Sequence, residues 1–172
     1  MQDTSGAQTR YLIGLGSNRY RGGPPRRMIV RTIAALEADG IEIIRRSSII
    51  ATPPLGPGRR HYANAAALVR TDLDPPALLA VCKAIERSLG RRRGRRWGDR
   101  IIDIDLLLWS GGCWSDGALI IPHPALSTRD FVLTPLAEIA PDWRHPLSGL
   151  AIRHLHHHVR RNMPVDRSPN RP

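Results

Sequence analysis

The sequence predicts an α+β fold, a ferredoxin-like β-α-β-β-α-β sandwich with an antiparallel sheet and helices, followed by a C-terminal helical extension. Three observations support this class. Strand-like and helix-like patterns follow one another in that order between residues 11 and 109. Two more helical patterns come after the last strand. The length of 172 residues suits one domain with a sizeable core. We therefore expect a single domain over residues 11–161, with disordered tails at 1–10 and 162–172.

The first strand and helix are separated by a loop. Residues 11–15 form a short apolar run that leads into Gly16-Ser17-Asn18, and a stretch rich in Gly, Pro and Arg follows. Apolar residues then recur at helical spacing over 26–38. Asp39-Gly40 predicts the end of this helix, because glycine readily adopts the backbone conformation that closes one.

Two strands and a second helix come next. Residues 41–51 are rich in β-branched side chains and predict one strand, which ends at the rigid proline loop 52–57. Residues 63–71 predict the third strand. Asp74-Pro75-Pro76 predicts a helix start, and apolar residues keep helical spacing from there until Gly90.

The last predicted strand covers residues 101–109, which are largely apolar. A glycine-rich hairpin is expected at 110–118. Helical patterns at 131–139 and 151–161 complete the chain.

The composition indicates an anionic partner. The net charge is +11 and the pI is near 11.3, which favours a nucleotide, a nucleic acid or, less readily, a membrane surface. The two cysteines, Cys82 and Cys113, fit neither a disulfide framework nor a zinc site, so we expect a reducing compartment and place the protein in the cytoplasm. No run approaches the roughly 18 apolar residues of a membrane span, and the first nine residues are polar.

Two aspartates lie two residues apart in the last predicted strand. Residues i and i+2 of a strand share a face, so Asp103 and Asp105 project together. Two charges about 7 Å apart repel by about 2.4 kcal/mol at an effective dielectric near 20. A divalent cation that prefers oxygen ligands would offset this repulsion. The alternative is a pair of solvent-facing residues on a half-exposed strand. The opposite face is predicted to carry Ile102, Ile104, Leu106 and Leu108.

An arginine-rich segment precedes this strand. Residues 91–100 contain six arginines, and glycines stand at positions 90, 94 and 98. Guanidinium groups bind phosphate oxygens in a bidentate manner and keep their charge. We expect a mobile loop that closes over a polyphosphate beside the carboxylate pair, the combination that phosphoryl transfer needs.

Seven motifs together resemble one known family. In chain order they are Gly14-Leu15-Gly16-Ser17-Asn18, Thr52-Pro53-Pro54-Leu55-Gly56-Pro57, Tyr62-Ala63-Asn64, Arg96-Trp97-Gly98, Arg100-Ile101-Ile102-Asp103-Ile104-Asp105, Pro122-His123 and Arg129-Asp130-Phe131. The chain resembles the 6-hydroxymethyl-7,8-dihydropterin pyrophosphokinases of the folate pathway over most of residues 11–143. The string Arg-Trp-Gly-x-Arg-x-x-Asp-x-Asp, combined with the proline loop, is highly specific.

The resemblance implies the activity. Such an enzyme transfers pyrophosphate from ATP to 6-hydroxymethyl-7,8-dihydropterin and yields AMP and the pterin diphosphate. By the same resemblance, two Mg²⁺ ions are the cofactors, with ATP as co-substrate. We expect these small molecules to be the partners, without nucleic acid or membrane, and we expect a monomer.

The resemblance also implies the site. Asp103 and Asp105 would hold the metals, and Arg91 and Arg100 would be catalytic. Residues implied to bind ATP are Glu86, Arg91, Arg93, Arg96, Trp97, Arg100, Leu106, His123 and Arg129. Residues implied to bind the pterin are Gly16, Thr52, Pro53, Leu55, Tyr62, Asn64, Trp97, Asp103 and Phe131. The rings of Tyr62 and Phe131 would stack on the pterin, while Asn64 would hydrogen-bond its edge.

Four alternatives remain open on the residues alone. A basic nucleic-acid-binding protein would explain the charge, yet it leaves the aspartate pair unexplained. A nucleotide-sugar transferase also uses an Asp-x-Asp metal site, although this chain is short for one. On the residues alone, Tyr62 and Phe131 fit ordinary core aromatics better than ligand-stacking rings, a preference that the family resemblance reverses. The histidine cluster His154, His156, His157 and His158 fits a solvated helix face better than a metal site.

Overall fold

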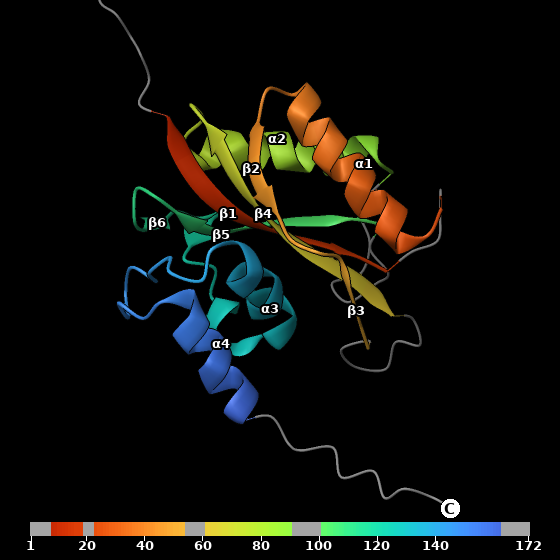
Figure 1. The fold of residues 1–172 in the computed structure, drawn as a ribbon. Coiled ribbons are helices and arrows are strands. Elements are labelled where there is room, and N and C mark those ends of the chain that lie inside the picture. The colour runs from red at the N-terminus through yellow and green to blue at the C-terminus, as the bar shows by residue number, and fades with distance from the viewer. Residues whose placement is uncertain (1–7, 19–22, 54–60, 91–100, 163–172) are drawn as a thin grey trace, which may run out of the picture.

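A computed structural model of the chain describes residues 8–18, 23–53, 61–90 and 101–162. These residues form an α+β fold with an antiparallel sheet (Figure 1). The elements are β1 (Thr9–Ser17), α1 (Pro25–Ala38), β2 (Glu42–Arg46), β3 (Ile50–Thr52), β4 (Tyr62–Thr71), α2 (Pro75–Ser88), β5 (Asp103–Trp109), β6 (Trp114–Ser115), β7 (Ile120–Ile121), a 3₁₀ turn (Leu126–Thr128), α3 (Asp130–Ile139) and α4 (Ile152–Arg161).

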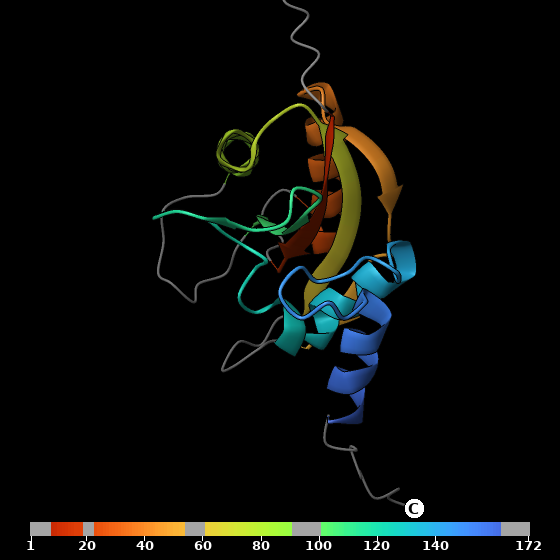
Figure 2. The same ribbon diagram turned by 90° about the vertical axis from the view of Figure 1, so that its left-hand side faces the viewer.

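The main sheet has the order β2-β4-β1-β5, and the short β3 also pairs with β4. Helices α1 and α2 cover one face, while α3 and α4 cover the other (Figures 1 and 2). Each face therefore has its own apolar core, which we call the first core (α1, α2) and the second core (α3, α4). The predicted ferredoxin-like sandwich is confirmed, and the C-terminal extension supplies the second helical layer.

Both helices of the first core begin and end near the predicted residues. The Asp74 side chain caps α2 by accepting a hydrogen bond from the Ala77 backbone N–H at 2.9 Å. Near the N-terminus, β1 begins at Thr9, so two residues of the predicted N-terminal tail belong to this strand. Residues 1–7 and 163–172 of the predicted tails lie outside the described residues.

The single strand predicted over 41–51 is wrong. The structure divides it into β2 and β3, because hydrogen bonds to side chains interrupt the regular backbone pairing at Ser47 and Ser48. The Ser47 hydroxyl accepts a hydrogen bond from the Ala66 N–H at 2.9 Å, and the Ser48 N–H donates to the Glu138 carboxylate of α3, also at 2.9 Å. The ladder with β4 is interrupted there, so β3 forms a separate short strand.

The predicted face of Leu108 is also wrong. β5 pairs with β1 through Ile13↔Leu106 and Leu12↔Leu108, so Leu107 is an extra residue that forms a β-bulge. Ile102, Ile104 and Leu106 pack in the first core as expected, and Leu107 lies on the opposite face as strand alternation requires, but the bulge sends Leu108 to the second core as well.

Within the described ranges, no helix has the length and apolar character that crossing a membrane requires. Cys82 is buried and Cys113 is exposed, and both are free thiols. Burial raises the pKa of the Cys82 thiol to about 12, so this side chain behaves as a small apolar group of the first core.

Candidate active site

The predicted carboxylates and Asn64 meet at one end of the sheet through the middle strand β1. Gly16 pairs with Asp103 of β5 on one side and with Asn64 of β4 on the other. One step further along β1, Gly14 pairs with Asp105. Because paired residues of neighbouring strands point to the same face, these polar side chains share one face. Further along the strands, the same face of the sheet packs against α3 and α4 in the second core.

The two glycines leave the centre of this face without side chains. A Cβ atom added at Gly16 would lie 3.3 Å from Asn64 Oδ1, and one at Gly14 would lie 3.2 Å from Leu107 Cδ1. Both contacts are tighter than ordinary van der Waals contact, so any larger residue would displace a neighbour. Leu107 covers Gly14, so a flat ligand placed here would contact the backbone of Gly16, with the carboxylates on one side and Asn64 on the other.

Burial and mutual repulsion disfavour the charged form of the carboxylate pair. Burial is the main cause that raises the pKa of the Asp105 carboxyl, and the neighbouring Asp103 charge raises this pKa further. His123 and Lys83 act in the opposite direction and lower it. Two carboxylates that share a partly buried site in this way are suited to an oxygen-seeking cation. Among the described residues, however, no group of three or more His, Cys, Asp and Glu side chains converges as a metal site.

A buried acid and a lysine of α2 support the edge of this site. Glu86 is only 1% exposed, and its Oε1 accepts hydrogen bonds from the Ile104 N–H and the Lys83 ammonium, each at 2.8 Å. The Lys83 Nζ also lies 3.9 Å from Asp103 Oδ1. Sequence reasoning missed Lys83. The one signal that could have found it is that Lys83 is the only lysine in an arginine-rich chain.

Replacing Lys83 by methionine should destabilise the protein by about 1 to 2 kcal/mol. The change removes a charged hydrogen bond to buried Glu86. It also removes the positive charge that offsets the repulsion between Glu86, Asp103 and Asp105. The partial exposure of Lys83 limits the loss of stability. Urea unfolding at pH 7 measures the effect. Lys83→Arg should retain most of the stability, and Arg87→Met, on the exposed side of α2, should serve as the matched control. Equal stability of Lys83→Met and the wild type would contradict the supporting role.

The opposite side of the site is built from β3 and β4. The Asn64 Nδ2 donates to the Thr52 hydroxyl at 2.7 Å, which fixes the side-chain amide of this buried asparagine. Thr52 pairs in register with Tyr62, whose ring is half-buried. The predicted residues Thr52, Tyr62 and Asn64 are thus neighbours, and Pro53 directly follows β3.

The third part of the site lies at the start of α3. The Arg129 guanidinium carbon is 5.8 Å from the centroid of the Phe131 ring, a cation–π contact, and both side chains are half-buried. The backbone N–H of His123 donates to the Leu107 carbonyl at 3.0 Å. The His123 Nδ1 accepts a hydrogen bond from the Ala125 N–H at 3.1 Å, so the neutral ring carries its proton on Nε2.

Several predicted residues are not brought to this face. Leu106 is implied to bind ATP, but its side chain is buried in the first core, opposite the carboxylates. Of the histidine cluster, His154, His157 and His158 are exposed, whereas His156 packs toward α3. The predicted site residues that lie outside the described residues are Leu55, Arg91, Arg93, Arg96, Trp97 and Arg100.

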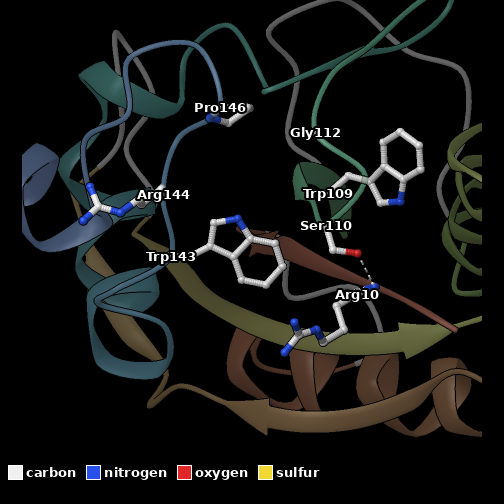
Figure 3. Close-up of a pocket in the computed structure, with 7 residues that line it drawn as sticks. All are labelled: Arg10, Trp109, Ser110, Gly112, Trp143, Arg144 and Pro146. Carbon is white, nitrogen blue, oxygen red and sulfur yellow. Dashed lines mark hydrogen bonds between the residues drawn. The ribbon is translucent and has the colours of Figure 1, made fainter.

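A separate groove of about 310 Å³ lies at the far ends of β1 and β5 (Figure 3). Its lining residues are Arg10, Trp109, Ser110, Gly112, Trp143, Arg144 and Pro146. None of them is a predicted site residue. The Ser110 hydroxyl accepts a hydrogen bond from the Arg10 N–H at 2.9 Å and so ties the two strands together there.

Comparisons with known proteins point to one family. The model of the family described as 7,8-dihydro-6-hydroxymethylpterin-pyrophosphokinase (HPPK) matches residues 12–141. A 2-amino-4-hydroxy-6-hydroxymethyldihydropteridine pyrophosphokinase of Methylorubrum extorquens is 46% identical over 136 residues, which cover 78% of this chain and 84% of the relative. The protein of the same name from Synechocystis is 41% identical over 145 residues, or 84% of this chain and 73% of the relative.

The fold has solved counterparts. The crystal structure of wild-type Plasmodium falciparum HPPK-DHPS is similar with a TM-score of 0.73 and 16% identity, and the match covers 91% of this chain and 42% of that longer one. At this identity the similarity supports the fold alone.

Proposed function

Because the chain belongs to the 7,8-dihydro-6-hydroxymethylpterin pyrophosphokinase family, we propose that the face shared by Asp103, Asp105 and Asn64 is where its reaction takes place. The reaction is the transfer of a pyrophosphoryl group from ATP to 6-hydroxymethyl-7,8-dihydropterin in folate synthesis. The observation that carries the proposed location is the pairing of Gly16 with both Asp103 and Asn64, which puts the acidic and amide groups on either side of bare backbone.

Asp103 and Asp105 fit Mg²⁺ by their donor chemistry. Both present only carboxylate oxygens, and burial together with the Asp103 charge raises the pKa of Asp105, which a cation would reverse. Mg²⁺ typically takes one or two carboxylates and completes its coordination with substrate phosphates and water, so a two-carboxylate site suffices. Mg²⁺ bound there would neutralise the charge of the phosphates and lower the pKa of the pterin hydroxyl.

The pterin lies, in this proposal, over Gly16 with its edge at Asn64. The Asn64 side chain is already oriented by Thr52, so binding costs little conformational freedom. Tyr62 and Phe131 flank this position and stack on the rings. Pro53, Leu55 and Trp97 complete the pterin contacts that the family resemblance implies.

ATP would lie on the side of the carboxylates. Arg129 and His123 are the described residues proposed to contact it, Glu86 holds the strand edge through Ile104, and Leu106 contributes through its backbone. In the reaction, the pterin hydroxyl oxygen bonds to the β-phosphorus, the bond from that phosphorus to the α–β bridging oxygen breaks, and AMP leaves while the hydroxyl proton is released. The arginines proposed to balance the charge of the phosphates are Arg91, Arg93, Arg96 and Arg100.

We further propose one catalytic domain over residues 9–161 that acts as a cytoplasmic monomer. Only four large apolar side chains of the described residues are exposed, which argues against an extensive apolar interface. They are Val30, Ile120, Leu147 and Leu150.

The nucleotide product tests the reaction. Incubation with ATP, Mg²⁺ and 6-hydroxymethyl-7,8-dihydropterin should produce AMP in an amount equal to the pterin diphosphate, measured by ion-pair chromatography. Omission of the pterin should abolish AMP formation, and omission of Mg²⁺ should do the same. ADP as the sole product would indicate transfer of one phosphate, and the absence of pterin-dependent turnover would refute the activity.

A further inference from the structure

Helices α3 and α4 meet in a small polar cluster at the start of α3. Asp130 and Thr134 lie one turn apart on α3, and His156 and Arg160 lie one turn apart on α4. His156 Nε2 is 3.0 Å from the Thr134 hydroxyl and 3.5 Å from Asp130 Oδ1. Arg160 Nε is 3.8 Å from the same carboxylate oxygen. The Asp130 carboxylate therefore faces two basic side chains of the last helix.

The Oδ1 atom of Asp130 is buried, and in the part of the chain that the structure describes it accepts no hydrogen bond. The first turn of a helix favours a negative charge, and the basic groups of His156 and Arg160 lie just beyond hydrogen-bonding distance. A buried polar group in such a place adds little stability and instead restricts how two elements fit together. The apolar contacts of Ile152 and Leu155 already attach α4 to the second core.

The restricted turn carries two proposed ligand contacts. Asp130 stands between Arg129 and Phe131 in the chain, and the guanidinium of Arg129 lies over the Phe131 ring. Any rotation or shift of the first turn of α3 moves both side chains together. We infer that His156, through its hydrogen bond to Thr134 and its place beside the Asp130 carboxylate, is a positioning residue that holds this turn so that Phe131 can stack on the pterin. This inference rests on the proposed role of Phe131.

His156→Ala should raise both the KM and the Kd for the pterin about 3- to 10-fold, while kcat changes less than 2-fold. Calorimetric titration of the pterin with an unreactive ATP analogue gives Kd, and AMP formation gives kcat and KM. His156→Gln should restore wild-type values, because its amide nitrogen reaches the position of Nε2. His157→Ala is the matched control, since His157 is an exposed neighbour on the same helix and should leave both constants unchanged.

A double-mutant cycle separates positioning from a general loss of stability. In a Phe131→Ala background, His156→Ala should cause no further rise in the pterin KM, because the stacking ring it positions is gone. His156→Phe keeps the ring volume without a nitrogen and replaces His156→Ala if that variant does not fold. A lower Tm with unchanged pterin binding, or an equal effect in both backgrounds, would overturn the inference.

The wild-type enzyme separates this inference from the proposed site. If wild-type protein forms AMP and Phe131→Ala weakens pterin binding, yet His156→Ala binds like the wild type, only the positioning role fails. If Phe131→Ala has no effect, the pterin position fails and the positioning role fails with it.

Discussion

Asp105→Asn is expected to lower pterin-dependent AMP formation by about 10³-fold, or about 4 kcal/mol of transition-state stabilisation, while the protein remains folded. The amide keeps the size of the side chain but removes half of the charge proposed to bind Mg²⁺. Initial rates at saturating ATP and pterin, over a series of Mg²⁺ concentrations, measure the loss. Asp72→Asn, which changes an exposed aspartate before α2, should keep wild-type activity. Near wild-type turnover of Asp105→Asn would contradict the metal-binding role.

The same substitution has an opposite expected effect on the stability of the metal-free protein. Since the folded pKa of Asp105 is raised above the unfolded value of 3.8, the folded state holds this proton more tightly than the unfolded state. Stability is then lost as the pH rises from about that value through the raised pKa. Asp105→Asn removes this penalty, so its free energy of unfolding at pH 7 should equal or exceed that of the wild type, by up to about 2 kcal/mol. A clear decrease in urea unfolding would show that the carboxylate has a structural role.

Asn64→Ala should weaken pterin binding by about 1 to 3 kcal/mol, a 5- to 150-fold increase in Kd. The substitution removes the edge hydrogen bonds proposed for the pterin and also leaves the Thr52 hydroxyl without its partner. Affinity for an ATP analogue alone should change little, because Asn64 lies across Gly16 from the carboxylates. Titration calorimetry measures both affinities.

Asn162→Ala, at the exposed end of α4, is the matched control and should bind the pterin normally. If Asn64→Ala and the wild type have the same pterin Kd, the pterin does not lie over Gly16.

Local patterns were sufficient to predict the main elements. Helical spacing gave α1 and α2 nearly to the residue, since each has one apolar stripe and a proline in its first turn. The two-residue period of strands placed Asp103 and Asp105 on one face. Where a residue pattern repeats along the chain, the sequence alone is sufficient to predict the element and the face on which each side chain lies.

Features that depend on contacts across the fold could not be predicted. The bulge in β5 falls within three consecutive leucines, so hydrophobicity could not reveal which one is extra. The break between β2 and β3 depends on Ser47 and on Glu138, which is about 90 residues from its partner Ser48. Lys83 reaches Asp103 only because α2 packs against β5. Such contacts join segments that no local pattern connects.

The side chain of Leu107 also explains how the sheet tolerates Gly14. A missing side chain at the centre of a sheet leaves a void, and the extra leucine, Leu107, places its Cδ1 within 3.2 Å of where a Gly14 Cβ would stand. The Leu107 side chain and the absent side chain thus compensate each other within one layer. Any residue larger than glycine at position 14 would therefore have to displace Leu107 from this layer.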